Sequence, residues 1–137
     1  MALKNFFFNN IDKPFIIAEI ASAHLGKVEN LIYLLKKANN AHSDAIKFQI
    51  FKTENFVMKN NDYFKILKKL EFSYDKWRYV FNKTKKLKIK KICEIYEYER
   101  LIFAHKSKYF DAFKISSSSI YDRKIISYIS KNKFPII

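Results

Sequence analysis

Short apolar runs that alternate with helical segments are the feature that most constrains the fold of this chain. Five runs rich in Ile, Phe and Tyr have the length of buried strands, and they cover residues 14–20, 44–51, 91–96, 112–116 and 134–137. Strands that alternate with helices pair in parallel through right-handed crossovers. The sequence therefore predicts an α/β fold with a parallel sheet and no linker that divides it.

The segments between these runs carry apolar residues at helical spacing. Helices are predicted at 28–38, 62–70, 73–87, 97–105 and 121–130. Asp62 and Ser73 stand where N-caps are expected, because their side chains can accept the free backbone N–H groups of a first helical turn. We interpret the apolar stripes of these helices, including Trp77, as core positions.

Basic residues outnumber acidic residues by 27 to 13, which gives a formal net charge of +14. Such a charge favours nucleic acid as a partner. However, the sequence contains no nucleic-acid-binding motif, and arginine, the usual base-reading side chain, occurs only at Arg78, Arg100 and Arg123. The abundance of Lys, Asn, Ile, Tyr and Phe is also typical of A/T-rich coding, which is a simpler source of the charge. Nucleic-acid binding is therefore the less favoured alternative.

The cellular location is inferred from two further features. The sequence has no apolar run long enough to span a bilayer and no signal-peptide pattern. Its single cysteine, Cys93, has no second cysteine with which to form an internal disulfide, in agreement with a reducing compartment. We expect a cytoplasmic protein without a membrane partner.

Charged and polar residues interrupt the predicted strands near their carboxyl ends. Glu19 lies late in the first run, Lys47 and Gln49 in the second, Glu94 in the third and Lys114 in the fourth. Strands covered on both faces normally read as continuous apolar runs, and the carboxyl ends of parallel strands are where α/β proteins bind ligands. The pattern favours an anion site with two lysine anchors. An internal network of ion pairs without a ligand is the alternative.

Other kinds of site find little support in the sequence. Gly26 is the only glycine, so a glycine-rich phosphate loop is excluded. His24, His42 and His105 lack metal-site spacing, and Cys93 has no CxxC partner, so no metal ligands are assigned. The serine run 116–119 follows the fourth strand, where its hydroxyl groups suit hydrogen bonding to an oxyanion.

Five segments together resemble the sialic acid (N-acetylneuraminate) synthase family. In sequence order they are PFIIAEIASAHLG (14–26), DAIKFQIFKTENFV (44–57), ILKKLEFSYDKW (66–77), DAFKISSSS (111–119) and KFPII (133–137). The resemblance implies a (β/α)8 TIM-barrel fold, of which a chain of this length would hold about the first four βα units. Residues 1–137 would then form a partial synthase barrel domain. The second half of the barrel and the family's antifreeze-like domain would lie beyond it.

The resemblance also implies a transferase of sialic acid biosynthesis. Members of the family condense phosphoenolpyruvate with an N-acetylated amino sugar, such as N-acetylmannosamine, to a nine-carbon acidic sugar and release phosphate. A divalent metal, Mn²⁺ or Mg²⁺, polarises the sugar aldehyde, and its ligands are not expected in this chain. The resemblance implies a homodimer, and the domain that forms the family's dimer is expected to lie beyond residue 137. Activity of these 137 residues alone is therefore left open, and a catalytically inactive remnant is the main alternative.

Site residues are carried over from the family by position. The resemblance implies catalytic roles facing the sugar and the reacting carbons for Glu19 and Gln49. It implies phosphoenolpyruvate binding for Lys47 and Lys114, a hydrogen bond to this substrate from Ser117, and further substrate contacts for Tyr96 and His24.

Three positions depart from the family pattern. Glu94 replaces a threonine, and it puts a negative charge where phosphoenolpyruvate is expected. Ala21 and Ser118 replace family glycines at points where close approach of the backbone is expected. Glu94 is therefore expected to weaken phosphoenolpyruvate binding.

Overall fold

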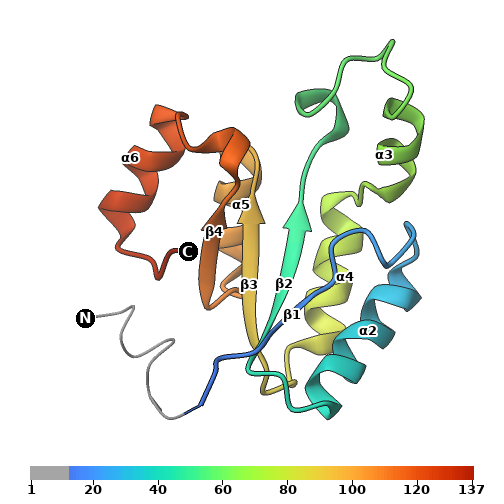
Figure 1. Ribbon diagram of the computed structural model, residues 1–137, viewed down its shortest axis with the longest axis vertical. Helices are drawn as coiled ribbons and strands as arrows, with labels where there is room; N and C mark the ends of the chain where they lie inside the picture. Colours follow the sequence, from blue (N-terminus) through green and yellow to red (C-terminus); the bar gives the residue numbers. More distant parts are fainter. Residues whose placement is uncertain (1–12) are drawn as a thin grey trace.

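The computed structural model describes residues 13–137 (Figure 1). Its strands are β1 (Ile17–Glu19), β2 (Ala45–Ile50), β3 (Lys90–Ile95) and β4 (Ala112–Ile115). Its helices are α2 (Val28–Asn40), α3 (Phe64–Leu70), α4 (Tyr74–Thr84), α5 (Tyr98–Ser107) and α6 (Arg123–Asn132), with short 3₁₀ turns η1 (Thr53–Asn55) and η2 (Ser117–Ser119). Within the described residues, no helix combines the length and the apolar character needed to cross a membrane.

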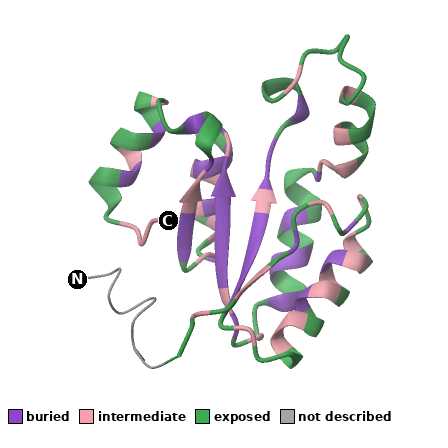
Figure 2. Ribbon diagram, viewed as in Figure 1, coloured by how far each residue is buried: buried purple, intermediate pink, exposed green. Residues whose placement is uncertain are grey.

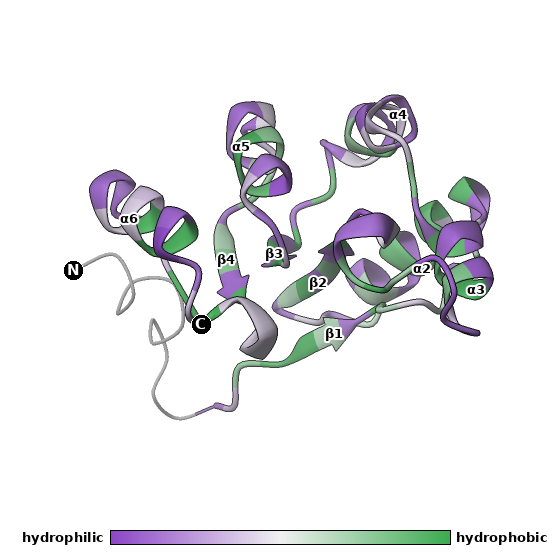
Figure 3. Cartoon of the chain, turned by 90° about the horizontal axis from the view of Figure 1, so that it is seen from above, coloured by the Kyte–Doolittle hydropathy of each residue, from purple (hydrophilic) through white to green (hydrophobic). Residues whose placement is uncertain are grey.

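The four strands form one parallel sheet in the order β1-β2-β3-β4. A fifth segment begins to pair beside β4, because Phe113 donates its backbone N–H to the Pro135 carbonyl at 3.0 Å and accepts one from Ile137 at 2.9 Å. The helices of residues 13–137 lie on the convex side of this curved sheet (Figure 3). The predicted parallel sheet, with strands neighbouring in chain order, is confirmed.

Strand residues alternate between a large helix-facing core and a small apolar cluster on the other face. Ile46, Phe48 and Ile50 of β2 belong to the core shared with the helices, whereas Ala45 packs with Ile92 on the opposite face. Buried residues accordingly concentrate in the strands and on the inner sides of the helices (Figure 2). Since successive strand residues point to opposite faces, Lys47 and Gln49 lie on the concave face, away from the helices.

The core interpretation of the helical stripes holds best for α4. Trp77 is only 3% exposed, as predicted, and packs within the core. The predicted cap Ser73 is confirmed, because its hydroxyl oxygen accepts the backbone N–H of Lys76 at 3.3 Å. This bond satisfies one of the free donors of the first turn.

The cap predicted for α3 is wrong. The helix begins at Phe64 with Tyr63 at the N-cap position, and no described side chain caps it. The polar side chain that orders this turn is Asn61, whose Oδ1 atom accepts the Tyr63 backbone N–H at 2.9 Å, so the cap expected from Asp62 is not made. None of the seven residues of α3 is fully buried, which shows that its apolar stripe covers the rim of the core rather than its centre.

The single glycine holds the β1–α2 loop against α3. Gly26 has φ of +72°, and a Cβ atom there would lie 2.1 Å from the carbonyl oxygen of Lys69. No other residue fits this close backbone approach. Ala21, at a family glycine position in the same loop, also has a positive φ of 44°, so it adopts a conformation that costs a non-glycine residue about 1 kcal/mol.

Candidate anion site at the carboxyl ends of the strands

A repeated Asp-Ala-x-Lys motif places two lysines at equivalent heights in the sheet. Asp44 precedes β2 and Asp111 precedes β4. Their carboxylates accept the backbone N–H groups of Ile16, just before β1, and of Lys91 in β3, each at 2.7 Å. Each motif ends three residues later, at Lys47 and Lys114 respectively. Alternate strands of a barrel contribute side chains to the same interior layer. The repeat is visible in the sequence, where Asp-Ala-x-Lys occurs at 44–47 and again at 111–114.

The structure brings five predicted polar side chains into one cluster. Lys47 Nζ lies 2.7 Å from Glu19 Oε1 and 3.0 Å from Glu94 Oε2. Lys114 Nζ lies 2.5 Å from Glu94 Oε1, and Gln49 Nε2 donates to Glu94 Oε2 at 3.2 Å. Glu94 is therefore the centre of the cluster, and it contacts side chains from both neighbouring strands.

Opposing effects set the charge states in this cluster. Burial alone would lower the pKa of Lys47, but hydrogen bonds to Glu19 and Glu94 outweigh it, and the pKa is raised. Burial alone would raise the pKa of Glu94, but hydrogen bonds from Lys114, Lys47 and Gln49 outweigh it, and the pKa is lowered. Lys47 and Glu94 thus stay charged near pH 7, and with Glu19 and Lys114 the cluster contains two carboxylates and two lysines.

Tyr96 follows β3 and joins an aromatic group at the same end of the sheet. Its ring centroid lies 5.0 Å from that of Phe56 and 6.3 Å from that of Phe51, both edge-on. Burial raises the pKa of its hydroxyl group, so Tyr96 is a neutral hydrogen-bonding group near pH 7. Phe56 keeps 46% of its surface exposed, so an apolar face remains open beside the polar cluster.

The serine turn after β4 is tied to the end of β3. Ser119 Oγ donates to the Tyr96 carbonyl at 2.7 Å, and the backbone N–H of Ser116 donates to the Ile95 carbonyl at 3.1 Å. Ser117 is exposed at the start of this turn. Its hydrogen bond to a substrate stays a prediction.

His24 is held in the β1–α2 loop rather than within the polar cluster. Its side chain is 3% exposed, its ring centroid lies 4.6 Å from that of Phe72, and its Nδ1 atom accepts the Gly26 N–H at 3.1 Å. Burial lowers its pKa, so the ring is neutral near pH 7. These contacts show a loop-ordering role, and a substrate contact for His24 stays a prediction.

Comparison with known proteins decides the family of this chain. The model of the NeuB family matches residues 34–137. The chain belongs to the NeuB family. The predicted relationship to the N-terminal part of a sialic acid synthase barrel is therefore confirmed, and the protein is sugar-acid-synthase-like.

Relatives of this NeuB-family chain include proteins of archaea and bacteria. It is 30% identical over 126 residues to an uncharacterised protein of Methanocaldococcus jannaschii, covering 92% of this chain and 37% of that protein. It is 27% identical over 146 residues to the pseudaminic acid synthase of Campylobacter jejuni, covering 95% of this chain and 42% of that enzyme. The chain thus spans less than half the length of these relatives.

Solved structures confirm the fold class. The N-acetylneuraminic acid synthetase of Leptospira borgpetersenii, determined with citrate, matches 89% of this chain and 42% of its own length, with a TM-score of 0.80 at 21% identity. A spore coat polysaccharide biosynthesis protein of Bacillus subtilis matches 91% of this chain and 36% of its own length, with a TM-score of 0.71 at 24% identity. The sheet is therefore part of a (β/α)8-type barrel, represented by its first four βα units.

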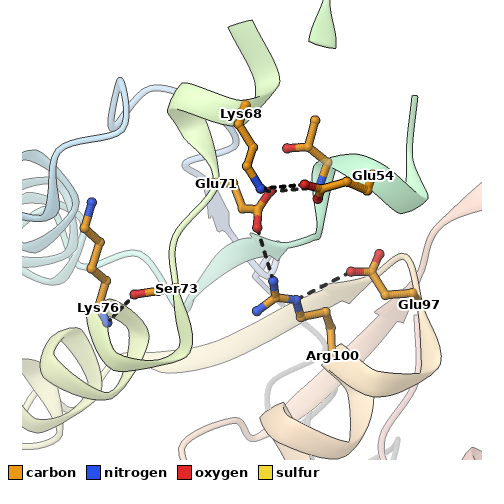
Figure 4. A network of polar contacts seen from close by, with 8 residues as sticks. Glu54, Lys68, Glu71, Ser73, Lys76, Glu97 and Arg100 are labelled. Atoms are coloured by element: carbon orange, nitrogen blue, oxygen red, sulfur yellow. Dashed lines mark hydrogen bonds and ion pairs between the residues drawn. The ribbon is translucent and has the colours of Figure 1, made fainter. Parts of the chain in front are cut away.

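A second polar network of this NeuB-family chain was not predicted from the sequence. It is formed by Glu71, Glu97 and Arg100 (Figure 4). Glu71 Oε2 accepts the backbone N–H of Thr53 at 2.9 Å, and the Glu97 carboxylate hydrogen-bonds the backbone of Lys52. Arg100 lies between the two carboxylates, 3.5 Å from each. The network therefore holds the segment that follows β2 and its Gln49. The i,i+3 spacing of Glu97 and Arg100 was the available signal.

Further contacts complete this network. Lys68 Nζ lies 2.8 Å from Glu54 and 3.0 Å from Glu71, and the Arg100 guanidinium lies 4.3 Å from the centre of the Tyr74 ring. Arg100 Nη1 is buried and has no hydrogen-bond partner among the described residues. Arg100 is thus held by two carboxylates and an aromatic face, with little contact with solvent.

Glu97 is expected to make the stability of the protein depend on pH. Burial raises its pKa to about 7, above its value in an unfolded chain. The folded state therefore binds the proton more tightly, and the free energy of unfolding falls as pH rises from about 4.5 to about 7. Glu97→Gln is expected to be more stable than the native chain at pH 8 by about 1–3 kcal/mol, with a smaller difference at pH 4.5.

Urea denaturation at a series of pH values measures this effect. Glu29→Gln serves as the control, because Glu29 is an exposed carboxylate on another helix, α2. Its pH profile should match that of the native chain. If the free energy of unfolding depends on pH in the same way in the native chain and in Glu97→Gln, Glu97 is not the source of the pH dependence.

Proposed function

We propose that this chain contributes the phosphoenolpyruvate-binding part of a synthase that condenses phosphoenolpyruvate with an N-acetylated amino sugar of the N-acetylmannosamine type. The products would be a nine-carbon acidic sugar and phosphate. Membership of the NeuB family and the barrel fold support this reaction class. The proposal adds the identity of the two substrates to this reaction class.

The observation that carries the proposal is the convergence of two lysines on one anionic group. Lys47 and Lys114 come from alternate strands, and both ammonium groups contact the carboxylate of Glu94, at 3.0 and 2.5 Å. Lysine is a point-charge binder of phosphate and carboxylate groups, and phosphoenolpyruvate carries both. The carboxyl ends of barrel strands are also where barrel enzymes bind their substrates. The two ammonium groups would hold phosphoenolpyruvate by its two anionic ends.

The other residues of the cluster have roles that fit the amino sugar. The Glu19 side chain is 59% exposed and pairs with Lys47, and Gln49 donates to Glu94 in the same cluster. Both polar groups would face the sugar. Tyr96 would contact the sugar through its aromatic ring. Ser117 would donate its hydroxyl hydrogen to phosphoenolpyruvate. His24 would keep the first loop in place beneath these groups.

A divalent metal is implied by the family reaction, and it would polarise the sugar aldehyde. Among residues 13–137, no three or more His, Cys, Asp and Glu side chains gather as a metal site requires. The described residues therefore do not fit this metal, and we derive no step through it.

Substrate binding and turnover by the purified chain test the proposal. Isothermal titration with phosphoenolpyruvate is expected to show saturable binding that Lys47→Ala/Lys114→Ala loses. Phosphate release and the nine-carbon product are then measured with N-acetylmannosamine and Mn²⁺ present. If the native chain and the double variant bind phosphoenolpyruvate equally, the proposal is wrong.

A catalytically inactive relative is the second candidate function. The charge balance of the cluster favours it, because Glu94 occupies both lysines. Lysine-dependent binding without product formation would support this candidate over an active synthase. Salt-sensitive retention on DNA that Lys47→Ala leaves unchanged would instead support the nucleic-acid alternative.

A further inference from the structure

Glu94 uses both of its carboxylate oxygens to occupy the two lysines. Oε1 contacts Lys114, and Oε2 contacts Lys47 and accepts a hydrogen bond from Gln49. The side chain is buried, with the residue 5% exposed. Its position is therefore the one that an anionic group of a ligand would take between these lysines.

We propose that Glu94 is a built-in anion that fills the position of the substrate's anionic group and thereby sets the affinity of the site for anionic substrates. The inference rests on the proposed function, and it adds the residue that controls affinity there. Binding of a dianion requires the Glu94 carboxylate to leave the lysines. This displacement separates two buried ion pairs before the ligand forms its own.

The balance of charges explains why this single residue has a large effect. With Glu94 ionised, two carboxylates oppose two ammonium groups and the cluster has no excess positive charge. With a neutral residue at this position, the lysines exceed Glu19 by one charge. Glu19 itself is 59% exposed at its side chain, so water screens it far more than it screens Glu94. Glu94 is thus the stronger determinant of anion affinity.

Isothermal titration tests this inference. It measures how tightly the native chain, Glu94→Gln and Glu94→Thr each bind phosphoenolpyruvate and inorganic phosphate. Glu94→Gln keeps the shape and a hydrogen-bonding group, whereas Glu94→Thr removes both the charge and the bulk. Both variants are expected to bind each anion on the order of 10- to 100-fold more tightly than the native chain. Circular dichroism checks that each variant is folded.

A matched control removes the same charge elsewhere. Glu29 is exposed on α2, and Glu29→Gln is expected to bind both anions as the native chain does. Glu19→Gln removes a charge from the exposed side of the cluster. Its affinity for the two anions should rise by about 3-fold at most.

The outcomes separate this inference from the proposed function. If the native chain binds phosphoenolpyruvate through its lysines and neither Glu94 variant gains affinity, the inference is overturned and the proposed function stands. If the variants gain affinity while the native chain shows no lysine-dependent binding, the inference stands and the proposed function of the native chain fails. Weaker binding by both folded variants would mean that Glu94 helps the lysines to bind, and it would also overturn the inference.

Discussion

Lys47→Ala is expected to weaken phosphoenolpyruvate binding by about 10- to 100-fold, the contribution of a charge-assisted hydrogen bond in a poorly solvated site. Lys47 is buried and bridges Glu19 and Glu94, so its removal leaves two carboxylates with one ammonium group. The same change is expected to lower the free energy of unfolding by about 2 kcal/mol, because Glu94 keeps only part of its compensation. Isothermal titration and urea denaturation measure the two effects.

Two further variants separate the binding effect from the folding effect. Lys36→Ala removes an exposed lysine of α2 and should change neither quantity. Lys47→Ala/Glu94→Gln removes one charge of each sign, so it should regain most of the lost stability. It should still bind phosphoenolpyruvate more weakly than Glu94→Gln. If the Lys47→Ala variant binds as tightly as the native chain, Lys47 is not an anion anchor.

Arg100→Ala is expected to lower the free energy of unfolding by about 3–5 kcal/mol, the cost of leaving buried carboxylates without their partner. The Arg100 side chain is 7% exposed and lies between Glu71 and Glu97, each of which also accepts a hydrogen bond from the backbone after β2. Without the guanidinium, the Glu71 carboxylate stays buried without this partner, and the pKa of Glu97, already raised to about 7, rises further because Arg100 no longer lowers it. Urea denaturation at pH 7 measures the loss.

An exposed arginine provides the matched control for this prediction. Arg78 pairs with Asp75 on α4, and their side chains are 61% and 90% exposed. Water screens such a pair, so Arg78→Ala is expected to cost less than about 1 kcal/mol. Equal losses for Arg78→Ala and Arg100→Ala would show that the buried network adds nothing beyond a surface ion pair.

The two networks act on the same part of the molecule. The Glu94 cluster includes Gln49 at the end of β2, and the Arg100 network holds the backbone of Lys52 and Thr53 just beyond it. Loss of Arg100 is therefore expected to loosen the segment that follows the anion site. Each network also reaches solvent through one of its side chains, Glu19 in the first and Lys68 in the second.

The sequence alone was sufficient to predict the sheet and the gathering of its polar residues. Strand and helix periods follow from local backbone geometry, and parallel strands necessarily bring their carboxyl ends to one edge. The spacing of Lys47 and Gln49 by two residues likewise predicted that they share a face. The departure at Glu94 was also visible, since it needed only the family pattern for comparison.

Only the tertiary structure decided which side chains meet. The stagger of neighbouring strands places Glu94 opposite Gln49 and Lys114, and this register lets one carboxylate reach both lysines. Arg100 of α5 contacts Glu71 at the end of α3 and Glu97, and these two carboxylates bond the backbone of residues 52–53. These three segments are remote in sequence. Likewise, His24 packs on Phe72 because Gly26 brings its loop against α3. Periodicity determines the face on which a side chain lies, whereas register, loop path and burial determine its partner.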